Sequence, residues 1–479
     1  MVSVSNRAVI VGVAGLMAIA TAHYALAGGW QIGDAGHYHS VATNLAAGGD
    51  FALGMGDEPF APASPLWVVL LAIAAALGIE ATVAAKLLGA GFSAAAVVVT
   101  ARLAGDAMPR VRGVPLVAAA VMASGAVWLR WASSGMEWGL FVFLLALGTW
   151  RLLREERSGG FLWSVPAFGL LVATRPEGLL YAVVVAAVML ARQPRRLLTW
   201  SVAFSIPVGG YFVARYGWFG HWLAPGEILI QQRFDWWTER GATYLFKWAL
   251  LPEVWLLSPL AAFGVFRGRS RVLFACLGMV GVTLTAAMVT HGHWTAHQVM
   301  APVVLPMAVM YAYGVGEAVN AVRETRRAAV GAVALALPLI AGALTLAALP
   351  RYDTSVTALE ARAAYVEALF AENGVTGPVA CLDPEPMYGS VCEGIDYSGR
   401  AHYGFAAHRG DKAFAAQYVL EELKPAYIHL HGAWARVLGI DRSPTFQRDY
   451  VEVPGYQPGD AVHEGNYLRR DLIRDWSER

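Results

Sequence analysis

Long apolar runs recur along roughly the first 350 residues, and short polar connections separate them. Several runs fall short of the ~20 residues that a helix needs to cross a bilayer, but most are long enough for one helix. The pattern predicts an α-helical polytopic membrane protein with about 11 to 12 transmembrane segments. The runs cover 8–27, 64–79, 82–104, 114–132, 138–153, 160–174, 178–191, 197–213, 245–265, 272–290, 299–317 and 328–348.

Composition supports this interpretation. Of the 479 residues, 57% are hydrophobic and 15% are charged, whereas a soluble domain usually has about 25% charged residues. Mean hydropathy is +0.47, which is typical of a chain surrounded largely by lipid. Lys and Arg number 36, and Asp and Glu number 35, so the net charge is +1. These values exclude a single soluble globule and leave no basic excess for binding nucleic acid.

Arginines mark every second connection between the apolar runs. Such basic connections face the cytoplasm in membrane proteins, so the alternate connections, including loops 28–63 and 214–244, are predicted to face outward. Two full spans between 64 and 104 would place the basic loop around Arg110 on the wrong side. We therefore expect one of these two runs to be a re-entrant or broken half-helix. A cleaved signal peptide at 8–27 is an alternative that would not repair this parity.

The composition changes after Pro350, where charged residues become frequent. Apolar runs at 378–382 and 427–430 predict strands between helical patterns at 356–373 and 412–423. We therefore predict a transmembrane domain over 1–349 and a small extracytoplasmic α/β domain over 350–479. Cys381 and Cys392 would meet an oxidising compartment there, where they either pair or remain isolated thiols.

Ionisable side chains in the outward connections are the candidates for chemistry. Asp34 begins a helical pattern over 34–45, as either an N-cap or a reactive carboxylate. Glu137, Arg175 and Glu177 lie at helix ends, where each charge costs ~2.5–3.5 kcal/mol on insertion scales. They form either an ion pair that fixes helix packing or the lining of a polar cavity.

Histidines gather in the predicted outward turn THGHWTAHQ, at positions 291, 293 and 297. An H-x-H-x3-H pattern is compatible with a divalent metal, with phosphate contacts or with interfacial histidines, and we do not favour the metal. Loop 214–244 contains His221, Trp222 and Arg233 and is long enough to cover a substrate.

Six outward segments, taken in order, resemble a known class of enzymes. They are GDAGHYHSVATNL, ASPLW, SSGMEWGLF, TRPEGLL, the loop from Trp218 to Pro225, and HGHWTAHQVMAPVVLP. Together they resemble the GT-C class of polyprenyl-phosphate-sugar glycosyltransferases over about residues 30 to 310. Within this class the resemblance is closest to terminal arabinofuranosyltransferases of the actinobacterial cell wall. The C-terminal segment KPAYIHLHGAW resembles the extracytoplasmic domain of that branch.

The resemblance implies an inverting glycosyltransferase of the bacterial inner membrane whose active site is extracytoplasmic. It would move a sugar, with arabinofuranose as the best candidate, from a polyprenyl-phosphate donor to a glycan, glycolipid or protein acceptor. Asp34 corresponds to the catalytic base, and no cofactor is implied. A leaving phosphate needs cations, for which we name Arg175, Arg233, His221, His293 and His297. For substrate contacts we name Glu58, His37, Glu137, Glu177, Trp222 and Trp294.

Departures from the family pattern leave the sugar open. Gly33 stands before Asp34 where the family often has a second acid, and Gly226 and Gln231 replace the usual Asn and Lys. A mannosyl-type enzyme is therefore an alternative. A transporter or flippase that uses the ionisable helix ends, or a non-catalytic scaffold, is an alternative from another class.

Overall fold

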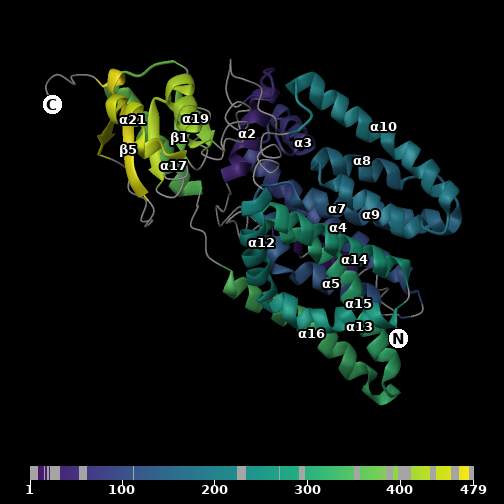
Figure 1. The fold of residues 1–479 in the computed structure, drawn as a ribbon. Coiled ribbons are helices and arrows are strands. Elements are labelled where there is room, and N and C mark those ends of the chain that lie inside the picture. Colours follow the sequence, from purple (N-terminus) through teal and green to yellow (C-terminus); the bar gives the residue numbers. More distant parts are fainter. Residues whose placement is uncertain are drawn as a thin grey trace.

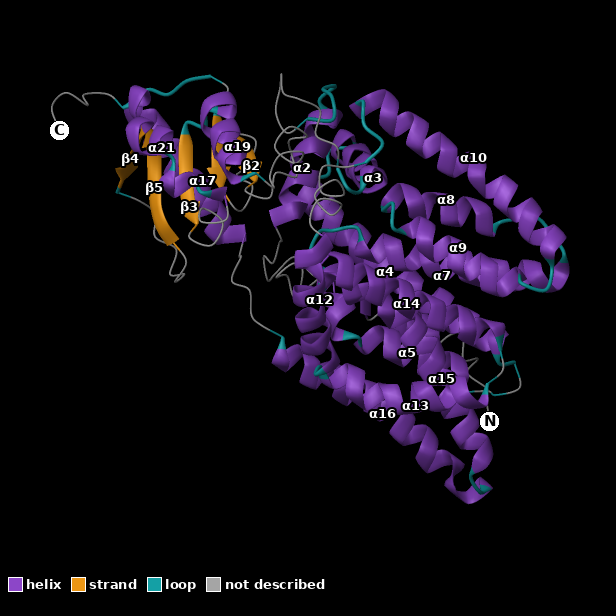
Figure 2. Cartoon of the chain, in the orientation of Figure 1, coloured by secondary structure: helices purple, strands orange, loops and turns teal. Residues whose placement is uncertain are grey.

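The computed structural model is mostly helical, with a small sheet near the C-terminus (Figure 1 and Figure 2). For Gly33, Asp34 and the first turns of α12 and α17, only the backbone is described. The described residues are 9–15, 17–18, 21, 33–52, 62–109, 111, 113–223, 234–268, 270–290, 297–349, 356–377, 379–383, 392–396, 411–431, 438–454 and 463–473.

Apolar helices make up the first part of the chain, and most follow the predicted runs. Their bounds are α2 (Gly33–Ala46), α3 (Pro65–Ala76), α4 (Ala81–Ala107), α5 (Val114–Ser124), α6 (Ala126–Ala132), α7 (Trp138–Ser158), α8 (Ser164–Thr174), α9 (Gly178–Leu190), α10 (Pro194–Phe219), α12 (Phe234–Ala249), α13 (Pro252–Arg267), α14 (Arg271–Thr290), the 3-10 helix η1 (Gln298–Val303), α15 (Val304–Ala321) and α16 (Glu324–Ala348). The predicted multi-helix character is thereby confirmed.

By length and composition, five helices among the described residues are able to cross a membrane, or seven if each of two bent pairs counts as one span. The bent pairs are α5 with α6, at 63°, and the second part of α12 with α13, at 79°. The runs at 114–132 and 245–265, each predicted as one transmembrane segment, are therefore bent helix pairs rather than straight helices. Gly125 is extended in the first break, and Leu251 is extended before Pro252 in the second, because a residue that precedes proline avoids the helical region. The total of 11 to 12 segments stays a prediction.

The short helix α3 does not cross the bundle. It has 12 residues and is therefore about 18 Å long. The Trp67 indole near its start donates to the Gly135 carbonyl at 3.0 Å. Thr82, just after the turn that follows α3, bonds the His39 ring at 3.3 Å, and that ring lies beside Gly135. Both ends of α3 thus lie near one end of the bundle, which fits the expectation of one non-crossing run between 64 and 104.

Glycines let α4 approach α7 closely near this end. A side chain at Gly139 would place its first carbon 2.7 Å from the Gly89 carbonyl oxygen. Such contacts between small residues bring helix backbones together in membrane proteins. The crossing fixes the turn at 133–137, immediately before α7, against the first part of α4.

The C-terminal part forms a five-stranded sheet with the order β2-β1-β3-β5-β4. β1 is parallel to β2 and β3, whereas β5 is antiparallel to β3 and β4. The predicted strands correspond to β1 and β3, and the predicted helices to α17 and α19 with η2. The elements are α17 (Val356–Asn373), β1 (Ala380–Asp383), β2 (Glu393–Asp396), α19 (Lys412–Gln417), the π-helical turn η2 (Tyr418–Leu423), β3 (Tyr427–His431), η3 (Ile440–Arg442), α21 (Pro444–Asp449), β4 (Tyr450–Val453), β5 (His463–Arg469) and η4 (Arg470–Leu472).

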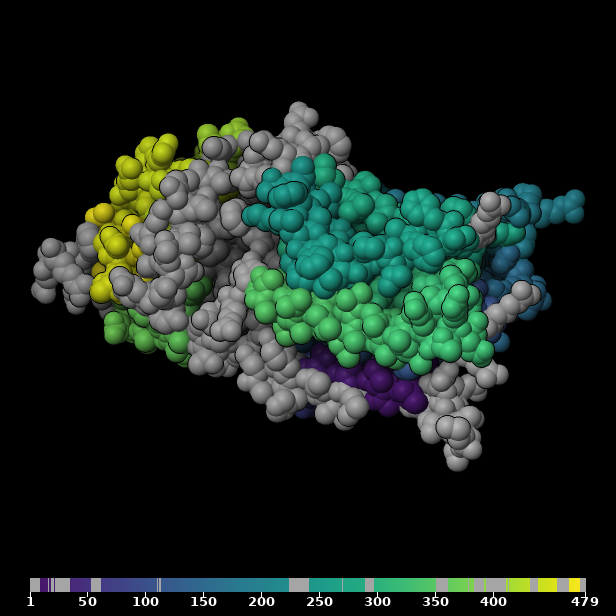
Figure 3. Space-filling model, turned by 90° about the horizontal axis from the view of Figure 1, so that it is seen from below, coloured from purple at the N-terminus to yellow at the C-terminus, as the bar shows by residue number. Residues whose placement is uncertain are grey.

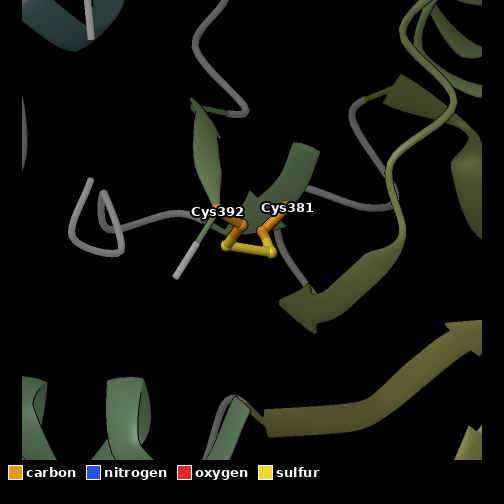
Figure 4. Close-up of a disulfide and its surroundings, with 2 residues drawn as sticks. All are labelled: Cys381 and Cys392. Atoms are coloured by element: carbon orange, nitrogen blue, oxygen red, sulfur yellow. A yellow bond between two sulfur atoms is a disulfide. The ribbon is translucent and has the colours of Figure 1, made fainter. Parts of the chain in front are cut away.

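The sheet lies beyond one end of the helices (Figure 1), and in a view from below the yellow C-terminal residues lie toward one end of the molecule (Figure 3). Its core contains the buried side chains of Leu382, Val419 and Ile428. Cys381 at β1 and Cys392 before β2 form a disulfide with a Cα–Cα distance of 5.9 Å (Figure 4). Of the two sequence alternatives for these cysteines, the structure has the pair. Cys276 in α14 is free and buried.

Candidate active site

The start of α2 packs against the turn at 133–137. Ala35 and His39 both lie 3.5 Å from the position that a side chain at Gly135 would take. Gly135 has φ +86°, a left-handed backbone that favours glycine. The sequence Ser-Ser-Gly-Met-Glu therefore makes a tight turn that α2 can approach closely. The contact brings the motif around Asp34 to the motif around Glu137.

Arg175 joins two glutamates in one cluster. Its Nη1 lies 2.5 Å from Glu137 Oε1, and its Nε and Nη2 lie 2.8 Å and 2.7 Å from Glu177 Oε1. The Glu137 side chain is fully buried, whereas 17% of Arg175 and 33% of Glu177 are exposed. The guanidinium carbon lies 4.6 Å from the centre of the Trp138 ring, which is within the range of cation–π attraction. The ion pair expected among these three residues is present, and Arg175 shares it between both glutamates.

Local sequence explains this geometry. Arg175 ends α8 with an extended backbone, φ −152° and ψ 132°, as expected before Pro176. Glu177 then precedes the first residue of α9, just as Glu137 precedes the first residue of α7. Carboxylates are favoured at helix N-termini by the helix dipole. Two helix starts thus present carboxylates to one arginine at the end of a third helix.

The charge balance of this cluster limits what it can bind. Burial raises the pKa of Glu137, and Arg175 opposes the rise. With Glu137 ionised, one cation faces two anions; with Glu137 protonated, the cluster is neutral. Neither state leaves a net positive charge for a phosphate. Glu137 Oε2 and Trp138 Nε1 are buried and lack a hydrogen-bond partner among the described residues. One acceptor and one donor are thus available for ligand hydroxyl groups.

Asp34 is the second residue of α2, and its side chain lies outside the described residues. Tyr38, one turn later, interacts electrostatically with Arg175. Residues i and i+4 share one face of a helix. The backbone therefore places Asp34 on the helix face that contains Tyr38, at the end of α2 that touches Gly135.

The start of η1 reaches the same turn. Gln298 Nε2 lies 3.5 Å from the sulfur of Met136. His297 has φ 61°, a conformation that is uncommon outside glycine and often found at functional sites, and its ring centre lies 5.2 Å from that of Tyr244. Burial, with Lys247 and Arg130 nearby, lowers the pKa of His297 to about 4. The free protein therefore holds His297 neutral near pH 7, so a phosphate contact there would use the neutral ring.

The remaining predicted residues divide into two groups. His37 is buried in α2, while Trp222 stacks on Tyr216 after the end of α10, with ring centres 4.5 Å apart, and His221 precedes it. The predictions for Glu58, Arg233, His293 and Trp294 fall outside the described residues.

Sequence reasoning missed three cations near these elements, Arg130, Lys247 and Arg215. Arg130 stands one turn before the Ser-Ser-Gly motif, and this proximity was an available signal. Within the described ranges, no group of three or more His, Cys, Asp or Glu residues is arranged to hold a metal ion. Two of the three histidines of the predicted turn, His291 and His293, lie outside those ranges.

No family model and no curated protein matches the sequence. Solved structures do match the fold. Arabinofuranosyltransferase AftD from Mycobacteria aligns over 98% of this chain and 40% of its own, with a TM-score of 0.52 and 15% identity. The Archaeoglobus fulgidus oligosaccharyltransferase in the apo form aligns over 98% of this chain and 74% of its own, with a TM-score of 0.56 and 12% identity. The same enzyme tethered to an acceptor peptide gives 0.51 and 11%, over 96% and 74% of the two chains.

The chain therefore spans less than half the length of AftD. At these identities the likeness concerns the fold, and that fold is of the GT-C type expected from the sequence motifs. The arabinofuranosyl branch stays a prediction.

Proposed function

We propose that this protein is an inverting glycosyltransferase that moves a sugar from a polyprenyl-phosphate donor to an extracytoplasmic glycan, glycolipid or protein acceptor. The meeting of the α2 start, the 133–137 turn and the Arg175 cluster at one end of a GT-C-type bundle carries the proposal. Arabinofuranose is the first candidate sugar, because the sequence motifs resemble the arabinofuranosyl branch.

In the proposed reaction, Asp34 acts as the general base. Its carboxylate takes the proton of an acceptor hydroxyl while the oxygen attacks the anomeric carbon. The bond between that carbon and the phosphate oxygen breaks, and its electron pair leaves with the prenyl phosphate. Attack from the face opposite the leaving group inverts the anomeric configuration. The leaving phosphate gains one negative charge in this step.

We assign the Arg175 cluster to the sugar or acceptor side of the reaction. Glu137 and Glu177 have oxygens that suit hydroxyl groups, and Arg175 positions both carboxylates. We assign binding of the phosphate to the other predicted residues, Arg233 and the histidines 221, 293 and 297. Arg130 and Lys247, which lie near His297, add positive charge on that side.

We place the site and the C-terminal domain outside the cytoplasm of a bacterial cell. The Cys381–Cys392 disulfide supports this placement, because disulfides persist mainly in oxidising compartments. The arginine-rich connections at the other helix ends support it as well.

The test is incubation of the purified protein with a panel of synthetic prenyl-phosphate sugars that includes arabinofuranose and mannose donors. We expect release of prenyl phosphate from one donor. Asp34→Asn should reduce this release by about 10²–10⁴-fold, the usual contribution of a general base. Asp50→Asn, an exposed carboxylate just after α2, is the matched control and should keep full activity. A folded protein that releases phosphate from no donor would exclude the proposal, and an active Asp34→Asn variant would remove Asp34 as the base.

A further inference from the structure

Arg215 is a buried cation with unused hydrogen-bond donors. It lies near the end of α10 with 1% of its surface exposed. Its Nη1 donates to the Tyr211 hydroxyl at 3.0 Å and reaches the Pro62 carbonyl at 3.5 Å. The guanidinium carbon lies 5.7 Å from the centre of the Phe219 ring. Nε and Nη2 have no hydrogen-bond partner among the described residues.

Two other arginines at helix ends have carboxylate partners. Arg175 pairs with two glutamates, and Arg271 pairs with Glu156 at 2.6 Å. Within the described part of the chain, no carboxylate lies within ion-pair distance of Arg215. Burying a guanidinium is costly unless a counter-charge and hydrogen bonds compensate it. A residue retained in this state is expected to meet an anion that the described residues do not supply.

The geometry of the unused donors indicates the kind of anion. Nε–H and one Nη2–H form a single edge of the guanidinium, with two nearly parallel N–H bonds. This edge matches two oxygens of a phosphate or carboxylate in a bidentate contact. Arg175 uses the same pair of nitrogens to hold Glu177. Among the described residues, Arg215 therefore has an unpaired fork of the kind that Arg175 uses on a carboxylate.

The surroundings favour an anion with an apolar tail. Phe51 packs against Trp218 and Phe219 at the end of α10, with ring centres 5.5 Å apart in both contacts. Trp218 and Trp222, at the same end of α10, are exposed by 60% and 51%, and exposed tryptophans at the end of an apolar helix are typical of the lipid interface. A phosphate at Arg215 could thus continue into an acyl or isoprenoid chain beside the helix. Inorganic phosphate, which has no apolar chain, would gain nothing from these aromatic side chains.

We propose that Arg215 binds the phosphate of a prenyl-phosphate lipid at the end of α10. His221 and Trp222, predicted from the sequence to bind the donor, follow Arg215 by six and seven residues. The identification of this lipid as the glycosyl donor rests on the proposed function. The binding itself does not, because it requires only the phosphate and the apolar chain.

The experiment measures lipid binding to the purified full chain in nonionic detergent. Farnesyl phosphate is the probe, farnesol is the control ligand without phosphate, and phosphatidylglycerol in the same micelles is the competing phospholipid. The variants are Arg215→Met, which keeps the apolar stem, and Arg215→Lys, which keeps the charge without the fork. Arg326→Met is the matched control, since Arg326 is exposed at the start of α16.

We expect Arg215→Met to bind farnesyl phosphate at least tenfold more weakly, or about 1.4 kcal/mol, with Arg215→Lys between it and the wild type. Farnesol binding and the Arg326→Met variant should be unchanged. The unfolding midpoint of Arg215→Met should stay equal or rise, because an unpaired buried charge is removed. If Arg215 had only a structural role, Arg215→Met would instead lower the unfolding midpoint and weaken the binding of both ligands alike.

Three results would overturn the inference. These are unchanged binding of farnesyl phosphate by Arg215→Met, an equal loss of farnesol binding, and displacement of farnesyl phosphate by an equal mole fraction of phosphatidylglycerol. The last result would make the site a general phospholipid contact. Sugar transfer is assayed separately. If Arg215-dependent binding persists in a protein that transfers no sugar, the proposed function fails alone, whereas an unchanged donor KM in active Arg215→Met protein removes only this inference.

Discussion

Replacement of Arg175 by methionine tests whether the cluster with Glu137 and Glu177 is held by charge. The substitution keeps an apolar side chain of similar length next to Trp138 but leaves the fully buried Glu137 carboxyl without its cation. Breaking a buried ion pair from one side typically costs about 3–5 kcal/mol. Loss of the partner of Glu177 adds at most about 1 kcal/mol, because that side chain is one-third exposed and solvent screens it.

Two companion variants separate charge from packing. Glu137→Gln retains an oxygen that accepts from Arg175 and removes the buried charge, so its cost should be well below that of Arg175→Met. The double variant removes both charges, and we expect it to regain at least about 2 kcal/mol relative to Arg175→Met.

The dependence on pH gives a further check. Burial raises the pKa of Glu137 above its ordinary value of 4.5, and Arg175 limits that rise. Without Arg175, the folded chain holds the proton to a higher pH than the unfolded chain does. The unfolding free energy of Arg175→Met should therefore fall as the pH rises above 4.5, and its deficit should nearly vanish below this value.

The thiol of Cys276 allows the unfolding of these variants to be measured by chemical labelling. It is free and buried in α14, whereas Cys381 and Cys392 are paired. A thiol-reactive fluorescent maleimide therefore reports unfolding of the helical part, and Cys276→Ala is the blank. The reasoning is refuted if Arg175→Met matches the wild type, or if Glu137→Gln and the double variant are as unstable as Arg175→Met.

Three other predictions concern separate contacts. Reduction should add two hydrogens to the intact mass and destabilise the C-terminal domain by ~3 kcal/mol, the value for a loop of about this length closed by Cys381 and Cys392; an unchanged mass would show free thiols. Glu253 accepts from the Ala126 amide at 2.9 Å at the bend between α5 and α6, so Glu253→Ala should cost about 1–3 kcal/mol and Glu253→Gln much less, as measured by thermal unfolding. Because the pKa of His297 is about 4, His297→Gln should leave the pH dependence of donor KM unchanged between about pH 5.5 and 7.5; a changed profile would show that the donor recharges the ring.

Hydrophobic patterning predicts most helices of this fold because an apolar run in lipid has to satisfy its backbone hydrogen bonds internally, as a helix does. It does not predict where a run bends. Ser124 and Gly125 interrupt the apolar residues only briefly, so the 63° break between α5 and α6 leaves little trace in hydropathy. Pro252 is a visible signal for the second break, yet a proline at the first helical turn is also tolerated without one. Bends depend on tertiary contacts such as that of Glu253 with Ala126.

The candidate site shows a similar division. The cost of ionisable residues at helix ends singles out Glu137, Arg175 and Glu177, and the structure joins them. Spacing cannot show that one arginine serves both glutamates, because this depends on how α7, α8 and α9 pack. Arg215 was not predicted as a site residue because it follows the apolar run at 197–213. The sequence pattern assigns it to the outer loop 214–244. Its contact with the Pro62 carbonyl joins segments that are distant in sequence, and spacing along the chain cannot show this.

The distribution of charge explains why the phosphate should be bound away from Arg175. Transfer from a prenyl-phosphate donor increases the negative charge on the leaving group, and fixed cations stabilise that change most effectively. Arg175 faces two carboxylates, and strengthening a phosphate contact there would weaken its hold on Glu137. Arg215 has no such competing carboxylate among the described residues, and its unpaired Nε and Nη2 can bind the new charge without losing an existing ion pair. In a site divided in this way, the carboxylates on the acceptor side remain available to bind hydroxyl groups and to take a proton. A separate cation binds the phosphate.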